Sequence, residues 1–179
     1  MSDMTAARIH KEEPHLIPVK TPVHLEWLRR QRNRPLLMKY FRQTRPITKS
    51  QQKQWRKNLN RKNARLFIVA AGGRWIGYVG FNPIDWRHKH AEFGIFILPE
   101  FQGGGHGKAA MRLLLEYGFV KLKLHKIYSD VIDYPNERRF EFYRKLGFKK
   151  EGRNKEHYRK GGRWFDSIPF SMFKSKSKK

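Results

Sequence analysis

The chain has 179 residues, and its 40 Lys and Arg against 15 Asp and Glu give a formal net charge of +25. It contains no cysteine, which excludes disulfides and thiolate metal sites. No apolar run approaches the roughly 18 residues of a transmembrane helix, and the N-terminus lacks the apolar core of a signal peptide. We therefore expect one soluble, cytoplasmic domain at residues 15–173, after a loosely ordered segment at 1–14 and before a basic tail at 174–179.

Basic residues dominate the first half of the chain. No Asp or Glu occurs from Trp27 to Ile84, whereas Lys and Arg recur throughout this stretch. A strongly basic surface attracts polyanions and repels polycations. The charge therefore favours RNA, the ribosome or another polyanion as a partner, with a general gain in solubility as the alternative. We expect no membrane partner.

Local signals predict a mixture of helices and strands. Thr21-Pro22 is typical of a helix start, and Thr48 with Gln51 fits a capping box. Gly72-Gly73 between two runs of β-forming residues predicts a hairpin. The predicted strands cover residues 15–20, 64–71, 75–81, 91–98, 126–132, 148–158 and 164–173. The predicted helices cover residues 22–31, 48–60, 105–122 and 136–146. Pro35 either ends the first helix or starts a second turn through residues 36–41.

Residues 102–107 read Gln-Gly-Gly-Gly-His-Gly and lie between an apolar strand and a helix. Glycines leave main-chain N–H groups uncovered, and the helix start adds unpaired N–H groups and about half a unit of positive charge. Such a loop is an anion cradle, and phosphate is its usual ligand. A flexible turn is the alternative that this stretch alone leaves open.

His88 and His90 have the spacing of a His-x-His metal motif. The sequence suggests no third ligand for this pair. We therefore expect residues 82–90 to form an exposed basic loop, and we expect no metal site.

Two spaced motifs resemble the GNAT superfamily of N-acetyltransferases. Gln-x-x-Gly-x-Gly at residues 102–107 resembles the family's acetyl-CoA loop, and the run from Asn136 through Tyr143 to Gly147-Phe148 resembles the helix after its fifth strand. The resemblance covers residues 65–173 and points to the branch that includes ribosomal-protein, amino-sugar and spermidine acetyltransferases. It implies an α+β (mixed α/β) fold, with a central, mixed and splayed sheet of about seven strands flanked by about four helices.

The resemblance implies acetyl-CoA as co-substrate. Its pyrophosphate would bind main-chain N–H groups of the loop and helix start, and its pantetheine arm would pair with the fourth strand. The implied cofactor-binding residues are Ile95, Phe96, Ile97, Leu98, Gln102, Gly103, Gly104, Gly105, His106, Gly107, Lys108, Asn136, Arg139 and Tyr143. The His106 side chain either touches a phosphate or lies on the surface. Arg139 stands where relatives usually carry alanine or serine, so it either reaches the phosphates or crowds the site.

The reaction is the attack of a neutral amine on a thioester, and the departing thiolate has to be protonated. The resemblance assigns the proton donor to Tyr143, for which packing beneath the splayed strands is the alternative role. Glu92 is the candidate base, acting through a water molecule, and a structural ion pair is its alternative role. Asp133 and Tyr134 are weaker candidates for the base.

The acceptor amine stays open. In the family the first helices and the last hairpin hold it, and here the first helices lie in the acid-free stretch. A polyamine would need carboxylates nearby, so the charge favours an anionic acceptor or one on a nucleic-acid-associated protein. A protein N-terminus or lysine and a nucleotide-linked amino sugar are the two candidates. The alternative function is a basic RNA- or ribosome-binding module of the same fold with little or no catalysis. The edge strands of the last hairpin are compatible with a homodimer.

Overall fold

The structure is a computed structural model that describes residues 12–58, 61–134 and 139–175. Predictions for most of the N-terminal segment, for Asn136 and for the end of the basic tail lie outside the described residues. Among the helices that are described, none is both long and apolar enough to cross a membrane.

One mixed sheet of eight strands organises the chain. Its order is β1-β2-β3-β4-β5-β8-β6, and β7 pairs with the first part of β8. Every pairing is antiparallel except that of β4 with β5. The strands are β1 (His15–Pro18), β2 (Arg65–Ala71), β3 (Arg74–Asp85), β4 (His90–Ile97), β5 (Lys126–Ile132), β6 (Lys149–Lys150), β7 (Asn154–Lys160) and β8 (Arg163–Phe173).

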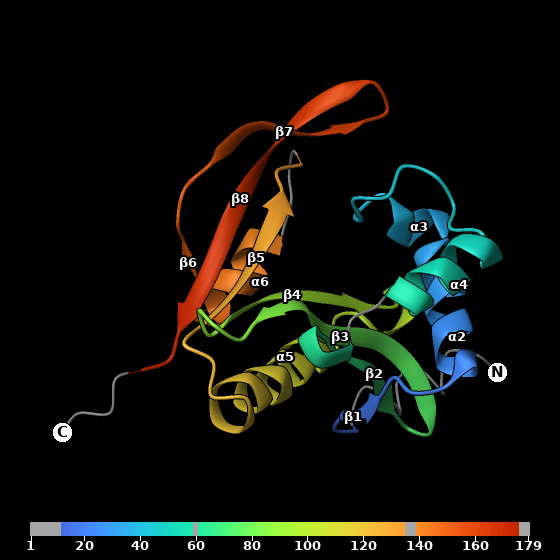
Figure 1. Cartoon of the computed structure of the whole chain (residues 1–179), viewed down its shortest axis with the longest axis horizontal. Coiled ribbons are helices and arrows are strands. Elements are labelled where there is room, and N and C mark those ends of the chain that lie inside the picture. Colours follow the sequence, from blue (N-terminus) through green and yellow to red (C-terminus); the bar gives the residue numbers. More distant parts are fainter. Residues whose placement is uncertain (1–11, 59–60, 135–138, 176–179) are drawn as a thin grey trace.

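Helices cover both faces of this sheet (Figure 1). They are α2 (Pro22–Arg32), α3 (Pro35–Met38), α4 (Lys49–Asn58), α5 (His106–Glu116) and α6 (Arg139–Lys145). Phe96 of β4 contacts Trp27 of α2, whereas Phe93 contacts Tyr143 of α6. Residues an odd number apart on a strand point to opposite faces. The first helices therefore cover one face of β4, and α6 covers the other.

The predicted start signals of the first helices are confirmed. Thr21 is the N-cap of α2, and its hydroxyl accepts a hydrogen bond from the His24 N–H at 3.3 Å. Before α4, the Gln51 N–H donates to the Thr48 hydroxyl at 3.1 Å, and the Gln51 side chain accepts from the Thr48 N–H at 2.9 Å. These reciprocal bonds form the predicted capping box.

The element count and some boundaries differ from the prediction. The sheet has eight strands because residues 148–158 divide into β6 and β7. Of the two alternatives for Pro35, the second turn is confirmed, and it forms a fifth, short helix over Pro35–Met38. The expected loop at 82–90 is mostly strand: β3 continues to Asp85 past a shift in register between Phe81 and Ile84. Pro83 suggested a loop because proline cannot donate to a ladder, but an irregularity in the pairing accommodates it.

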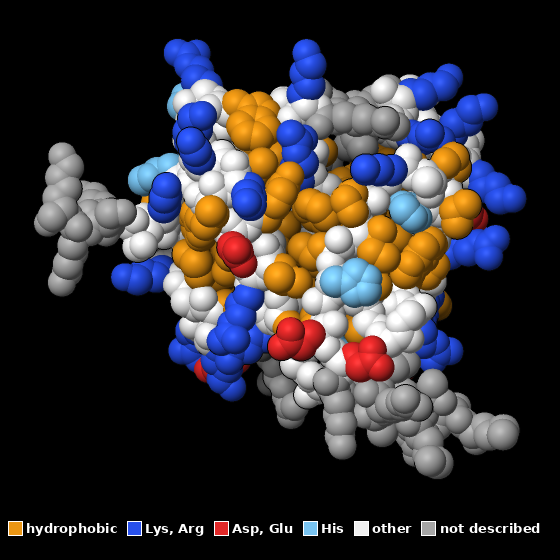
Figure 2. Space-filling model, turned by 90° about the horizontal axis from the view of Figure 1, so that it is seen from below, with side chains coloured by type: hydrophobic (Ala, Val, Ile, Leu, Met, Phe, Trp, Pro, Cys, Tyr) orange, Lys and Arg blue, Asp and Glu red, His pale blue; other side chains and the backbone are white. Residues whose placement is uncertain are grey.

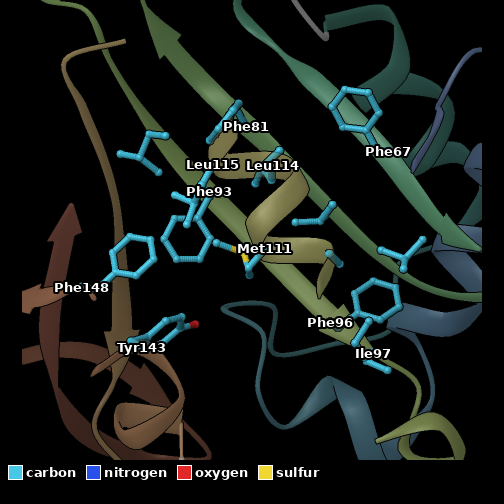
Figure 3. Packing of buried hydrophobic residues seen from close by; sticks show 14 of the residues in the cluster. Phe67, Phe81, Phe93, Phe96, Ile97, Met111, Leu114, Leu115, Tyr143 and Phe148 are labelled. Atoms are coloured by element: carbon cyan, nitrogen blue, oxygen red, sulfur yellow. The ribbon is translucent and has the colours of Figure 1, made fainter. Parts of the chain in front are cut away.

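The core lies between the sheet and α5. Met111 and Leu114 are fully buried against it, and Figure 3 shows them beside Phe81 and Phe93. At Gly118, in the π-helical turn that ends this helix, an added Cβ would lie 2.6 Å from the Ile127 Cδ1 atom. The end of this helix therefore packs closely on the sheet, with no room for a larger side chain at this position.

One lysine joins the β7–β8 hairpin to the end of α3. The Lys160 ammonium donates hydrogen bonds to the main-chain carbonyls of Met38, Lys39 and Phe41, at 2.9, 2.8 and 2.6 Å. Carbonyls at a helix end lack partners within the helix, and a cation there is favourable. The last hairpin and the first helices are therefore connected although they are distant in sequence.

We expect Gly77→Ala to destabilise the fold, because its Cβ would lie 2.4 Å from the Phe96 carbonyl oxygen on the neighbouring strand. Overpacking of this kind costs about 1–3 kcal/mol. Gly152→Ala is the control, since nothing lies within 4 Å of the Cβ it would add. Urea unfolding of both variants measures the difference. Equal stability of the two would contradict the observed register of β3 and β4.

Candidate active site

Strands β4 and β5 are hydrogen-bonded at one end only. Their parallel pairing joins residues 90–92 with residues 126–128 and then stops. Beyond this point β4 stays with β3, and β5 stays with β8. In Figure 1, β4 runs across the view while β5 and β8 rise steeply away from it. This divergence opens a cavity of about 610 Å³.

Side chains from both faces of the sheet line the cavity. One group comes from α2, α4 and the segment after α3, another from α6, and a third from the strands. The lining residues include Arg32, Phe41, Arg42, Tyr78, Glu92, Gly94, Ile95, Phe96, Ile97, Gln102, Asp130, Arg139 and Tyr143. The cavity thus brings Glu92 together with Tyr143, as the proposed chemistry requires.

The glycine loop lies at the edge of this cavity. Gly103 and Gly105 have φ values of 88° and 84°, a conformation that glycine adopts without strain. Gly105 is the N-cap of α5, whose first turn contains no acidic residue. The N–H groups of this turn have no helical partners, and Lys108 is exposed beside them. The loop can therefore hold a phosphate group through its main chain.

Two loop side chains have contacts that sequence reasoning missed. The Gln102 side-chain amide donates a hydrogen bond to the Ile97 carbonyl at 2.8 Å, which anchors the loop to the end of β4. His106 is only 2% exposed, so the expectation of a surface position is wrong. This histidine is the first buried residue of α5. Its main-chain N–H stays at the helix start.

The cavity-facing edge of β4 is open. From Phe93 to Ile97, no described strand pairs with β4 on the β5 side. Main-chain groups on such an edge can pair with an extended ligand. The Leu98 N–H donates to the Ile76 carbonyl, on the β3 side. Hydrogen-bonded pairs alternate along an antiparallel ladder, so the main-chain groups of Phe96, opposite Tyr78, also face β3. Phe96 and Leu98, both expected to pair with the pantetheine arm, are therefore engaged with β3. The Ile97 carbonyl accepts from Gln102, so Ile95 is the central position for pairing with a pantetheine arm.

Tyr143 of α6 is buried at the other wall of the cavity. Its ring packs against Phe93 and Phe170, with centroids 5.7 and 5.4 Å apart. In Figure 3 its hydroxyl points away from Phe148, which packs on the same aromatic cluster. Packing and chemistry are therefore compatible, because the ring is held by its neighbours while the residue lines the cavity.

Arg139 reaches across the cavity. Its guanidinium donates to the Ile132 carbonyl at 3.2 Å and lies over the rings of Tyr40 and Tyr134, at 5.0 and 5.6 Å from their centroids. Tyr134 in turn donates a hydrogen bond to the Lys39 carbonyl at 3.0 Å. These contacts connect α6 and the end of β5 to residues 39 and 40, after α3. Asn136, the neighbouring residue of the motif, lies outside the described residues.

The carboxylates of the cavity have partners that are distant in sequence. The Arg42 guanidinium forms an ion pair with Glu92. The Tyr158 hydroxyl donates to an Asp130 carboxylate oxygen at 2.8 Å. Burial, followed by this bond to Asp130, raises the pKa of Tyr158, so it stays a neutral phenol. Sequence reasoning missed Arg42, Asp130 and Tyr158, and no local motif marks them.

The two weaker candidates for the base are both engaged elsewhere. Asp133 forms an ion pair with Arg153, which also contacts Asp166 at 2.7 Å. The Tyr134 hydroxyl donates a hydrogen bond to the Lys39 carbonyl. Glu92 therefore remains the better placed candidate, although its ion pair with Arg42 also fits the structural role considered for it.

A second arginine lines the wall formed by α2. Arg32 lies over the Phe41 ring at 5.4 Å from its centroid, and burial lowers its pKa. Among the described residues its guanidinium forms no ion pair with a carboxylate. Tyr78 lies nearby, and burial raises its pKa to about 12. With the carboxylates of Glu92 and Asp130, the cavity therefore carries charges of both signs.

The histidine pair does have a third potential ligand. The ligand atoms of Asp85, His88 and His90 lie within 4.8 Å of one another, which corrects the expectation that none is near. Asp85 already accepts hydrogen bonds from the His88 N–H at 2.8 Å and shares a contact of 2.9 Å with its ring. These hydrogen bonds stabilise the tight turn after β3, which explains why the three side chains lie together.

Comparison with known proteins identifies the family. The model described as "Acetyltransferase (GNAT) family" matches residues 27–148. A spermidine N(1)-acetyltransferase of Escherichia coli is 36% identical over 117 residues, which cover 65% of this chain and 62% of that protein. One from Vibrio cholerae is 31% identical over 145 residues, which cover 80% of this chain and 83% of that protein.

Solved structures agree. The crystal structure of a spermidine N-acetyltransferase from Vibrio cholerae in complex with CoA and spermine matches with a TM-score of 0.82 and 27% identity, over 90% of this chain and 95% of that chain. The mixed α/β fold and the splayed sheet that the two motifs implied are confirmed. Since the family model covers more than half of the sequence, this chain belongs to the acetyltransferase (GNAT) family.

Proposed function

We propose that the protein is an acetyl-CoA-dependent N-acetyltransferase and that its acceptor is a primary amine of a polyamine. The observation that carries this proposal is the cavity between β4 and β5, which has the glycine loop at its edge and both Tyr143 and Glu92 in its walls. The relatives named for spermidine support the choice of acceptor. The aligned region spans less than two thirds of the Escherichia coli relative, so whole-protein activity is part of the proposal.

The residues present fit acetyl-CoA. Main-chain N–H groups of residues 102–108 would bind its pyrophosphate, and the open edge at Ile95 would pair with its pantetheine arm. When bound, the cofactor supplies the acetyl group as a thioester. Arg139 contributes to the acceptor wall in this arrangement, and its predicted contact with the phosphates is not needed.

The proposed proton transfers use two residues. Glu92 accepts a proton from the acceptor ammonium through a water molecule, so that the amine can attack as a neutral nucleophile. Tyr143 would donate its hydroxyl proton to the departing sulfur, and the second proton released by the acylated nitrogen would return to Tyr143 through solvent. The two residues lie on opposite faces of the sheet and meet only across the cavity. Acceptor and cofactor would therefore enter from different sides.

The comparisons do not support the anionic or nucleic-acid-associated acceptor that the charge of the sequence favoured. Glu92 and Asp130 bring carboxylates into the cavity, as a cationic acceptor requires. RNA or ribosome binding likewise gains no support from the comparisons. Basic side chains nevertheless surround much of the face seen in Figure 2, in keeping with the net charge of +25.

The acceptor is tested by measuring thiol release from acetyl-CoA with spermidine, spermine, an aminoacyl peptide and a nucleotide-linked amino sugar. We expect the highest kcat/KM with a polyamine, and the acetylated product should be identified by mass spectrometry. Preference for the peptide or the amino sugar would overturn the choice of acceptor. Absence of thiol release with every amine would count against the enzymatic function itself.

We expect Tyr143→Phe to slow acetyl transfer by about 10²–10⁴-fold, the usual contribution of a positioned proton donor. The ring and its aromatic packing are kept, so CoA binding and the melting temperature should stay close to the wild-type values. Steady-state kinetics and calorimetric titration with CoA measure the two properties. An unchanged kcat would show that Tyr143 serves packing alone.

We expect Gly105→Ala to weaken CoA binding. Gly105, the N-cap of α5, has φ of 84°, which alanine disfavours, so the loop would shift and its N–H groups would move. Gly162→Ala is the matched control, since that glycine has φ of 79° and nothing within 4 Å of an added Cβ, but lies in the β7–β8 turn. Each substitution strains the backbone by about 1–2 kcal/mol. Equal CoA affinity of the two variants would argue against the loop as the phosphate site.

A further inference from the structure

The part of the cavity lined by Arg42, Glu92 and Asp130, where the acceptor is proposed to bind, already contains a cation that belongs to the protein. The guanidinium of Arg42 forms an ion pair with the Glu92 carboxylate and lies 3.5 Å from the Asp130 carbonyl oxygen. Its central carbon is 5.4 Å from the centroid of the Tyr158 ring. Three elements, β4, β5 and β7, therefore supply the surroundings of one positive group.

These surroundings have the chemistry of an ammonium site. Carboxylates beside an aromatic face bind cations through charge and through the quadrupole of the ring. Asp130 strengthens this character, because its side chain is largely buried and one of its oxygens, Oδ1, accepts no hydrogen bond from any described residue. A buried acceptor without a donor is costly. A ligand that brought N–H donors would satisfy it.

Arg42 can leave this position without unfolding a helix or strand. It lies in the irregular segment between α3 and α4, and its side chain is 48% exposed. The neighbours on each side are held independently: the Phe41 carbonyl accepts from Lys160, and the Gln43 side chain donates to the Arg32 carbonyl at 3.1 Å. The backbone is thus fixed, while the arginine side chain has solvent beside it.

We propose that Glu92, Asp130 and Tyr158 form an alkylammonium subsite for the acceptor, and that Arg42 occupies this subsite in the free protein until a polyamine displaces it. This inference rests on the proposed function and adds to it a residue that selects among acceptor amines. Arg42 acts as an internal competitor: weakly cationic amines fail to displace it, whereas a polyamine brings a second charge. Among the described residues, the other titratable group beside the Asp130 carboxylate is His157, whose ring nitrogen is 3.9 Å from it.

The experiment is calorimetric titration of spermidine into the CoA-bound protein and into two variants. We expect Arg42→Ala to lower the Kd for spermidine by about 5–10-fold, as for a site that its internal occupant holds 80–90% of the time. Arg30→Ala is the matched control. It removes the same charge from another partly exposed pair with a glutamate, Glu26, outside the cavity, so it reports the effect of net charge alone.

Two further variants separate the alternatives. Arg42→Lys keeps a competing cation, so its Kd should stay within about twofold of the wild-type value, which is the size of a surface change. Asp130→Asn should raise the Kd for spermidine in the Arg42→Ala background, where no competitor is present. If Arg42 serves only to orient Glu92, Arg42→Ala would bind spermidine no more tightly than Arg30→Ala, and the proposal would be overturned.

Acetylation and spermidine binding are measured separately, so the proposed subsite and the proposed function can fail independently. If the wild-type protein acetylates spermidine but Arg42→Ala binds it like Arg30→Ala, the enzymatic proposal stands and the internal competitor is excluded. If Arg42→Ala binds spermidine more tightly but no variant acetylates it, the subsite stands and the acceptor assignment falls. Absence of spermidine binding in every variant overturns both.

Discussion

The separation of β4 from β5 is the constraint on which the rest of the site depends. The two strands share only three residue pairs before they part. A ladder that ends inside a sheet leaves main-chain groups of β4 without a strand partner and leaves space between the two halves. The sheet holds together around this break because β5 pairs with β8 over seven positions and β4 pairs with β3 over most of its length.

The elements around the break serve it in different ways. The end of α5 packs closely on the sheet where Gly118 meets Ile127, and at its start Gln102 bonds to the Ile97 carbonyl, which holds the glycine loop at the end of β4. Helix α6 brings Tyr143 to the same opening from a different part of the chain. On the other face, Lys160 joins the last hairpin to the end of α3. The cavity is thus bounded by segments that meet only in the folded chain.

Local sequence predicted the elements well because their signals act over a few residues. The cap at Thr21, the capping box at Thr48 and the glycine after α6 all depend on neighbours in the chain. The buried position of His106 was not predictable in the same way, since it follows from how α5 rests on the sheet. The irregular continuation of β3 past Pro83 also depends on its pairing with β4.

The electrostatic character of the cavity is the property that the sequence alone predicted least well. Residues 27–84 contain no acid and suggested an anionic partner. In the folded chain, acids from later segments meet these arginines: Glu92 pairs with Arg42, 50 residues away, and Glu100 pairs with Arg34, 66 residues away. The electrostatic character of the cavity is therefore set by contacts across the sheet and cannot be taken from one segment.

The central claim is that the break between β4 and β5 binds acetyl-CoA with its thioester beside Tyr143. A crystal structure of the protein with CoA tests it most directly. We expect the pyrophosphate to bind the N–H groups of residues 102–108 and the pantetheine arm to lie along β4 at Ile95. The sulfur should lie within hydrogen-bonding reach of the Tyr143 hydroxyl. CoA bound at another surface, or with its sulfur remote from Tyr143, would contradict it.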